Sequence, residues 1–101
     1  MDYTHLSQPP RIEVLLRGQF TFFDTHLFAN IREMLTIPEM KVVVLNFREV
    51  DFIDSAALGM LLLARVEAEM HDVRLVLTQP SRVVEKAFKI SEFDTLFEMQ
   101  E

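Results

Sequence analysis

The 101-residue chain contains no cysteine and no tryptophan, and it has only two glycines. Without cysteine there is neither a disulfide framework nor a thiolate metal site. Lysine and arginine number ten against sixteen aspartates and glutamates, and they form no basic run. Nucleic acids and anionic lipids attract clustered positive charge, so a net charge of −6 argues against both as partners.

Long apolar segments and export signals are also absent. The longest run without a charged or polar side chain, Ala56 to Ala64, is too short to span a bilayer. The first ten residues contain an acid and two prolines instead of a basic patch followed by an apolar segment, so they do not predict a signal peptide. We therefore expect a cytoplasmic protein without membrane insertion.

Half of the residues are hydrophobic, and their periodicity predicts a single α/β domain over residues 1–101. Residues 11–20 alternate as a strand, and residues 3–7 are expected to pair with them across a proline turn. Residues 41–47 form a β-branched run that is apolar on both faces, which is typical of a central strand covered on both sides. Residues 72–80 alternate again and predict a further strand.

Three helices are predicted around these strands. Asp24 is expected to cap the first, the second runs from about Ser55 to His71, and Ser81 opens the third. The segment FDTLFEM, residues 93–99, fits either a short final strand or a helical turn. Strands that alternate with helices imply crossover connections. The prediction is a mixed sheet of four or five strands with helices packed on it and residues 41–47 at its centre.

The second helix is apolar on two opposite sides. We expect one side to face the core; it carries Gly59, Leu62, Leu63, Val66 and Met70. The other side is interrupted only by Glu67 and His71; it carries Ala57, Met60, Leu61, Ala64 and Ala68. Either neighbouring helices cover this second side, or its first turns are a docking surface for another protein, and both can hold for different parts of it.

The segment VVVLNFREVDFIDSAALGMLLLARVEA, residues 42–68, resembles the STAS domain of bacterial anti-sigma factor antagonists. In that family an apolar strand leads into a Phe/Tyr-Ile/Met-Asp-Ser-Ser/Thr-Gly/Ala-Leu loop that opens a helix. The resemblance extends to the early strand that ends near Gly18 and to the tail VRLVLTQPSRVVEKAFKISEFDTLFEM, residues 73–99. It implies a STAS-like fold for nearly the whole chain.

This resemblance implies a partner-switching role in transcription regulation. The unmodified protein would bind an anti-sigma factor, often itself a serine kinase of the GHKL type, and so release the sigma factor. Phosphorylation of a hydroxyl residue in the loop would end that complex. A metal-dependent serine phosphatase, or a response regulator carrying one, would restore it.

One position departs from the family pattern. Aligned with the family loop, the chain has Ala56 at the usual phosphoacceptor position, and alanine cannot be phosphorylated. Either the chain is a naturally silent member, or its hydroxyl residue was replaced. Ser55 is a weaker alternative acceptor, because it is expected to cap the helix or to bond the loop. Asp54 is expected to bond loop N–H groups, to fix the loop and to orient an acceptor hydroxyl.

The expected partner-binding surface consists of this loop and the first turns of the helix. Its residues are Asp54, Ser55, Ala56, Ala57, Met60, Leu61, Ala64 and Glu67. The nine phenylalanines are expected mainly in the core, although the segment FTFF, residues 20–23, is expected to border the docking surface in part.

We expect no enzyme, no cofactor and no metal site. The three histidines, His5, His26 and His71, are scattered without metal-ligand spacing, and two isolated glycines cannot form a phosphate-binding loop. The alternative function is a STAS-type regulatory subunit of a membrane transport ATPase complex. Such a subunit needs no phosphorylatable serine, so Ala56 favours this alternative.

Overall fold

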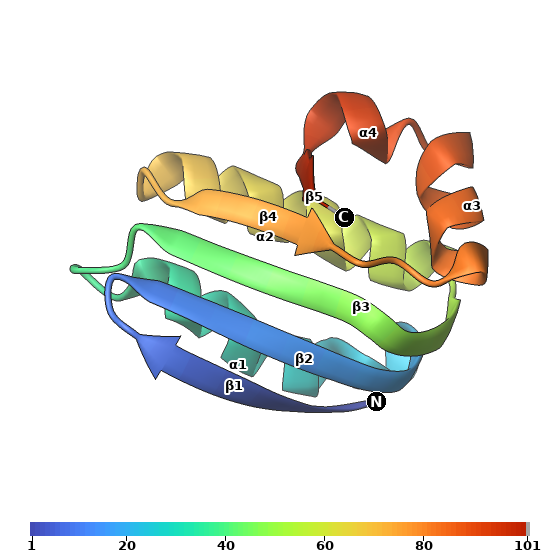
Figure 1. The fold of residues 1–101 in the computed structure, drawn as a ribbon, viewed down its shortest axis with the longest axis horizontal. Helices are drawn as coiled ribbons and strands as arrows, with labels where there is room; N and C mark the ends of the chain where they lie inside the picture. Colours follow the sequence, from blue (N-terminus) through green and yellow to red (C-terminus); the bar gives the residue numbers. More distant parts are fainter. Residues whose placement is uncertain (101) are drawn as a thin grey trace.

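A computed structural model describes residues 1–100 and arranges them around one five-stranded sheet (Figure 1). The strands lie side by side in chain order; β1 is antiparallel to β2, and all other neighbours are parallel. The elements are β1 (Asp2–Gln8), β2 (Arg11–Phe20), the short helix η1 (Phe22–Asp24), α1 (Thr25–Glu33), the short helix η2 (Met34–Thr36), β3 (Val42–Ile53), α2 (Ser55–Met70), β4 (Arg74–Thr78), α3 (Arg82–Ile90), α4 (Phe93–Leu96) and β5 (Glu98–Gln100).

The central position of β3 confirms the predicted mixed sheet. β3 is the third of the five strands, and Leu45 lies opposite Val14 of β2 and Leu77 of β4. Every side chain from Val43 to Phe47 is buried. Helices α1 and α2 lie on one side of the sheet, so the expected cover on both faces is wrong (Figure 1). Val44 and Asn46 point to the other face and are buried between neighbouring residues of β2 and β4. The polar member of that run is Asn46, whose side-chain amide donates to Glu13 at 3.2 Å and whose oxygen accepts from the Arg48 N–H at 2.9 Å.

Both ends of the chain match the predicted pattern. β1 pairs with β2 over its whole length, so the expected N-terminal hairpin is confirmed. Both alternatives considered for residues 93–99 occur: the helical turn α4 ends at Leu96, and β5 begins at Glu98. β5 adds to the free edge of β4 and lies opposite residues 76–78.

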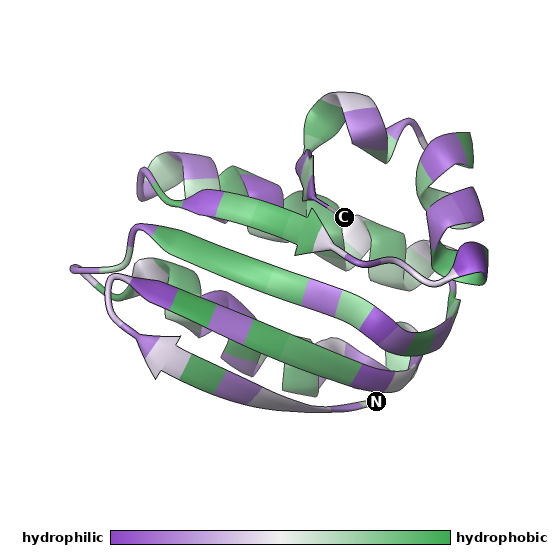
Figure 2. Cartoon of the chain, in the orientation of Figure 1, coloured by the Kyte–Doolittle hydropathy of each residue, from purple (hydrophilic) through white to green (hydrophobic). Residues whose placement is uncertain are grey.

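The helices cover the sheet unevenly. In Figure 1, α1 and α2 lie behind the sheet, and α3 and α4 lie at one end of it. Colouring by hydropathy shows the apolar first half of β3 in the middle of the sheet (Figure 2). Phenylalanine rings connect the end helices to the sheet: Phe88 of α3 contacts Phe47 at a centroid distance of 5.2 Å and Phe93 of α4 at 5.4 Å. No helix within residues 1–100 is long and apolar enough to cross a membrane.

The helix starts are capped by local hydrogen bonds, but not always by the residue that we predicted. Ser81 caps α3 as predicted, since its hydroxyl oxygen accepts from the Val84 N–H at 3.4 Å. Asp24 precedes α1, but its carboxylate makes no capping bond to that helix, so the predicted cap is wrong. The carboxylate instead accepts from the Thr21 N–H at 2.8 Å and completes a capping box that starts η1.

The orientation of α2 is opposite to the prediction. Leu62, Leu63 and Val66, expected in the core, are 38%, 54% and 48% exposed. The side that faces the sheet and α1 carries Ala57, Leu61, Ala64 and Ala68, all of them buried. The small alanine side chains let the helix backbone approach the sheet closely. The larger apolar side chains are left on the outside.

Candidate functional site at the start of α2

Asp54 joins the start of α2 to the turn before α1. It is the N-cap residue of α2, with extended backbone geometry. Its Oδ1 accepts from the Ala57 N–H at 2.8 Å, and its Oδ2 accepts from the Phe22 N–H at 3.0 Å. One carboxylate therefore satisfies a free donor at the helix start and a donor 32 residues earlier in the chain. These are loop N–H bonds of the kind expected of Asp54; the orientation of an acceptor hydroxyl stays a prediction.

The turn that Asp54 holds presents two aromatic side chains to solvent. Phe22 is 64% exposed and Phe23 is 91% exposed, and their rings contact each other edge to face at 5.9 Å. The capping box of η1 and the bond from the Thr25 hydroxyl to the Phe22 carbonyl, 2.7 Å long, fix the backbone of this turn. Phe20 is fully buried against Phe28, so the FTFF segment divides between core and surface.

Ser55 is the first residue of α2 and is exposed. Its hydroxyl makes no side-chain hydrogen bond among residues 1–100, because Asp54 already caps the helix. The predicted capping role of Ser55 is therefore wrong, so its hydroxyl is not engaged by the helix start. The alignment of Ala56 with the family's acceptor position stays a prediction. Ala56 is only half-buried, but it has no hydroxyl. At 100° per residue, Ser55 lies on the outward side of α2 with Gly59 and Leu62, and Ala56 lies at the flank of that side.

Half of the predicted partner-binding residues have buried side chains. Ala57, Met60, Leu61 and Ala64 are 0%, 9%, 0% and 1% exposed, because they belong to the side of α2 that packs on the sheet. Glu67 is half-buried and is held by the Arg32 guanidinium of α1. Asp54, Ser55 and Ala56 do reach the surface.

The prediction instead missed the outward side of α2. This side is apolar over Gly59, Leu62, Leu63, Val66 and Met70, which is the set that we expected in the core. A signal for its exposure was present in the sequence. Arg65 and Glu69 lie next to Leu62 on the helical wheel, and long charged side chains are seldom fully buried. They pair with each other at 3.2 Å at the rim of this side.

Ionisable groups with shifted pKa values lie elsewhere in the fold. Hydrogen bonding from Arg74 on β4 lowers the pKa of Glu98 on β5, and the same contact raises the pKa of Arg74. Within residues 1–100 no three His, Cys, Asp or Glu side chains come together as a metal site would require. The chemical groups available at the start of α2 are the Ser55 hydroxyl, the Asp54 carboxylate and the apolar side chains nearby.

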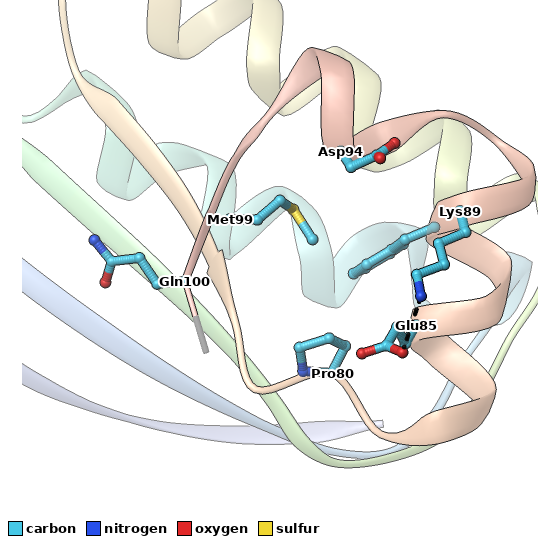
Figure 3. A pocket seen from close by; sticks show the side chains of 7 residues that line it. Pro80, Glu85, Lys89, Asp94, Met99 and Gln100 are labelled. Atoms are coloured by element: carbon cyan, nitrogen blue, oxygen red, sulfur yellow. Dashed lines mark ion pairs between the residues drawn. The ribbon is translucent and has the colours of Figure 1, made fainter.

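A shallow cavity of about 250 Å³ opens between α3, α4 and β5 (Figure 3). Phe88 and Met99 line it, and so do Glu85 and Lys89, which form an ion pair at 3.5 Å. None of its lining residues belongs to α2 or to the loop before it. The cavity and the Asp54–Ser55 site therefore share no residue.

Sequence comparison relates the chain to STAS-domain proteins. A family model of the STAS domain matches residues 6–101. A STAS-domain containing protein of Pseudomonas aeruginosa (strain UCBPP-PA14) is 33% identical over 88 residues, which cover 87% of this chain and 86% of that protein.

Three solved structures have a similar fold. The anti-sigma factor antagonist SpoIIAA in its unphosphorylated form has a TM-score of 0.83 at 20% identity, over 99% of this chain and 89% of its own. SpoIIAA of Bacillus in the phosphorylated form has a TM-score of 0.75 at 20% identity, over 99% and 92% of the two chains. A candidate anti-sigma factor antagonist from Thermotoga maritima has a TM-score of 0.85 at 16% identity, over 98% and 86%. At these identities the likeness is one of fold.

Proposed function

The chain belongs to the STAS domain family, and from that premise we propose that it is an anti-sigma factor antagonist that binds its partner while Ser55 is unphosphorylated. The observation that carries the proposal is the exposed Ser55 hydroxyl, free of side-chain hydrogen bonds within the described residues, beside the carboxylate of Asp54. The likeness in fold to SpoIIAA, whose structures include an unphosphorylated and a phosphorylated form, supports the same role.

We assign the acceptor to Ser55 instead of to the Ala56 position of the family alignment. A kinase needs an accessible hydroxyl, and position 56 offers none. Ser55 is exposed and stands on the outward side of α2, whereas Ala56 is half-buried at the flank. In this assignment Ala56 does not silence the switch.

Phosphate chemistry supports a switch at this position. Phosphorylation adds a charge of about −1.5 to −2 and three acceptor oxygens. The free N–H groups and positive dipole at the start of the 16-residue helix α2 tolerate an anion there, so the fold survives the modification. A partner that docks on the apolar side chains nearby would have to remove water from that charge, which costs several kcal/mol unless the partner supplies new hydrogen bonds.

The proposed partners follow from this chemistry. The unmodified protein would bind an anti-sigma factor or serine kinase of the GHKL type, and that kinase would phosphorylate Ser55 and release itself. A metal-dependent serine phosphatase, or a response regulator that carries one, would remove the phosphate. The chain itself contributes a binding surface and an acceptor, and no catalytic group.

The test begins with capture of binding proteins from the native host by the wild-type chain. A captured kinase, purified and incubated with the chain and ATP, should add one phosphate that mass spectrometry maps to Ser55. Ser55→Ala should abolish phosphorylation and retain binding, and Ser55→Glu should weaken binding. Ser7→Ala, at an exposed serine of β1, is the matched control and should behave as the wild type.

Two outcomes would contradict the proposal. In the first, the Ala56→Ser variant gains a phosphate at position 56 while the wild-type chain takes none, so the acceptor belongs at position 56. In the second, the captured partner is a transport ATPase and Ser55→Glu binds it as tightly as the wild type does.

A further inference from the structure

A second cavity, of about 330 Å³, lies on the face of the sheet that carries no helix, and among its lining residues are Leu6, Glu13, Leu15, Asn46, Arg48 and Gln79. Glu13 and Leu15 alternate along β2 with the core residue Val14, so their side chains point away from α1 and α2. Figure 1 shows this face turned toward the reader, with both helices behind the sheet. No residue of α2 or of the loop before it lines the cavity, which is therefore separate from the Ser55 site.

Asn46 is a polar residue inside the apolar run of the central strand, and only 3% of it is exposed. Its side-chain amide donates to Oε2 of Glu13 at 3.2 Å, and its oxygen accepts from the backbone N–H of Arg48 at 2.9 Å. A buried amide is costly unless its hydrogen bonds are made, and a satisfied polar network is rigid. Asn46 therefore holds the Glu13 side chain and the backbone at Arg48 in place on two sides of the cavity.

The lining of the cavity contains one carboxylate and one guanidinium, and only the carboxylate has partners. The Glu13 carboxylate accepts from Asn46 and pairs with Arg11 at 3.5 Å. Arg48 is exposed, and within residues 1–100 its side chain makes no ion pair and no hydrogen bond. The cavity therefore presents an uncompensated positive charge, although the chain as a whole has a net charge of −6.

Gln79 lines the cavity directly after the end of β4. Its φ is 52°, in the left-handed region that favours glycine, and its backbone N–H donates to the Gln100 carbonyl of β5 at 3.2 Å. In the described part of the chain its side-chain amide makes no hydrogen bond. Non-glycine residues in this backbone region cluster at ligand sites and other functional loops. The amide of Gln79 is therefore available to a molecule in the cavity.

We propose that this cavity binds a small organic monocarboxylate. Its carboxylate pairs with the Arg48 guanidinium and accepts from the Gln79 amide, and its short apolar body lies on Leu6 and Leu15. A guanidinium suits a carboxylate because two parallel N–H groups meet two oxygens, and a cavity of this volume holds a small molecule. The net charge of −6 disfavours a dianion such as a phosphate monoester. Neither Ser55 nor a protein partner takes part in this binding.

The test uses amide NMR spectra of the isotope-labelled chain, titrated with phenylacetate and with isovalerate in a buffer free of phosphate and of other carboxylates. Peak shifts should concentrate on Leu15, Asn46, Arg48 and Gln79. The tighter of the two probes should have a Kd of about 1 mM or below, as expected for ligands this small. Phenylacetamide has nearly the same shape without the charge, so it should bind at least about tenfold more weakly than phenylacetate.

The deciding variant is Arg48→Gln, which removes the charge and keeps a long polar side chain. Its melting temperature should match that of the wild type, and its Kd for the tighter probe should rise at least about tenfold. Arg48→Lys keeps the charge but loses the planar fork, so its Kd should lie between the two. The matched control is Arg82→Gln, at an exposed arginine of α3 that also has no ion pair within residues 1–100; its Kd should stay within about twofold of the wild-type value.

Four results would overturn the inference. Neither carboxylate shifts any peak, or Arg48→Gln binds the tighter probe as the wild type does. Phenylacetamide or phenyl phosphate binds as tightly as phenylacetate, which would mean that the cavity does not select a carboxylate. The peak shifts concentrate on Phe88 and Met99, which would place the ligand in the cavity between α3, α4 and β5.

Discussion

Two nearby leucines of α2 should differ sharply in their contribution to stability. Leu61 is fully buried, whereas Leu63, two residues later, is 54% exposed. Truncation of a buried leucine to alanine costs about 2–5 kcal/mol, and the cost rises when the surroundings cannot close the cavity. The flanking Ala57 and Ala64 are already buried on the same side, so the helix has little room to move inward. We expect Leu61→Ala to cost about 3–5 kcal/mol.

Leu63→Ala should be much milder. Full burial of a leucine contributes about 1.5–3 kcal/mol, and Leu63 has only about half of that burial to lose. Alanine also has a higher helix propensity than leucine, which offsets the loss of stability by about a few tenths of a kcal/mol. The net cost should be about 1 kcal/mol or less.

Urea denaturation followed by circular dichroism measures both variants. Urea m-values of small proteins are about 1–3 kcal/mol per molar, so a loss of about 3–5 kcal/mol in Leu61→Ala should lower the urea midpoint by about 1–5 M. Comparison of the two variants in one background cancels most errors of extrapolation. A larger loss for Leu63→Ala than for Leu61→Ala would refute the orientation of α2, and with it the exposure of its outward side.

Two further predictions concern hydrogen bonds that join separate elements. Asp54→Ala removes the cap of α2 and the bond to the Phe22 N–H, and should cost about 1–3 kcal/mol in urea denaturation, while Asp51→Ala, at an exposed position of β3, should cost less than about 0.5 kcal/mol. Equal losses for the two variants would contradict the role of Asp54. The pKa of Glu98 is lowered in the folded state by Arg74, so this pair stabilises the fold above the ordinary glutamate pKa and loses that contribution as the pH falls through the lowered value. The wild-type chain should therefore be slightly more stable to urea than Glu98→Gln near pH 7, and this difference in stability should vanish in acid, because solvent screens an exposed pair. A difference that grows in acid would contradict the direction of the pKa shift.

Much of the architecture was predictable because it depends on local patterns. The β-branched run before Phe47 marked β3 as central, and β3 is buried because β2 and β4 flank it and α1 and α2 pack on one of its faces. Ser81 marked the start of α3, because a serine before an amphipathic segment can satisfy a free helix N–H. Asp24 was wrongly predicted to cap α1 because it directly precedes that helix. Its carboxylate instead accepts from the Thr21 N–H in the short helix η1.

The loop at Asp54 was partly predictable. A resemblance in residues 42–68 directed attention to Asp54 and Ser55, and the structure has both at the surface at the start of α2. The bond from the Phe22 N–H to Asp54 spans 32 residues of sequence, so no local pattern could predict it. That bond brings the exposed pair of phenylalanines to the site.

By itself, the sequence determined the order of the first four strands and the three longer helices, the central strand and the helix that begins after Asp54, because each depends on periodicity and capping within a few residues. Only the tertiary structure decided which side of α2 meets the sheet. The helix is apolar on both sides, so hydrophobic periodicity alone permits either orientation. Packing resolves the choice, since the alanines at 57, 64 and 68 let α2 lie close against the sheet, and the bulkier leucines, valine and methionine then remain outside, on the same side as Ser55.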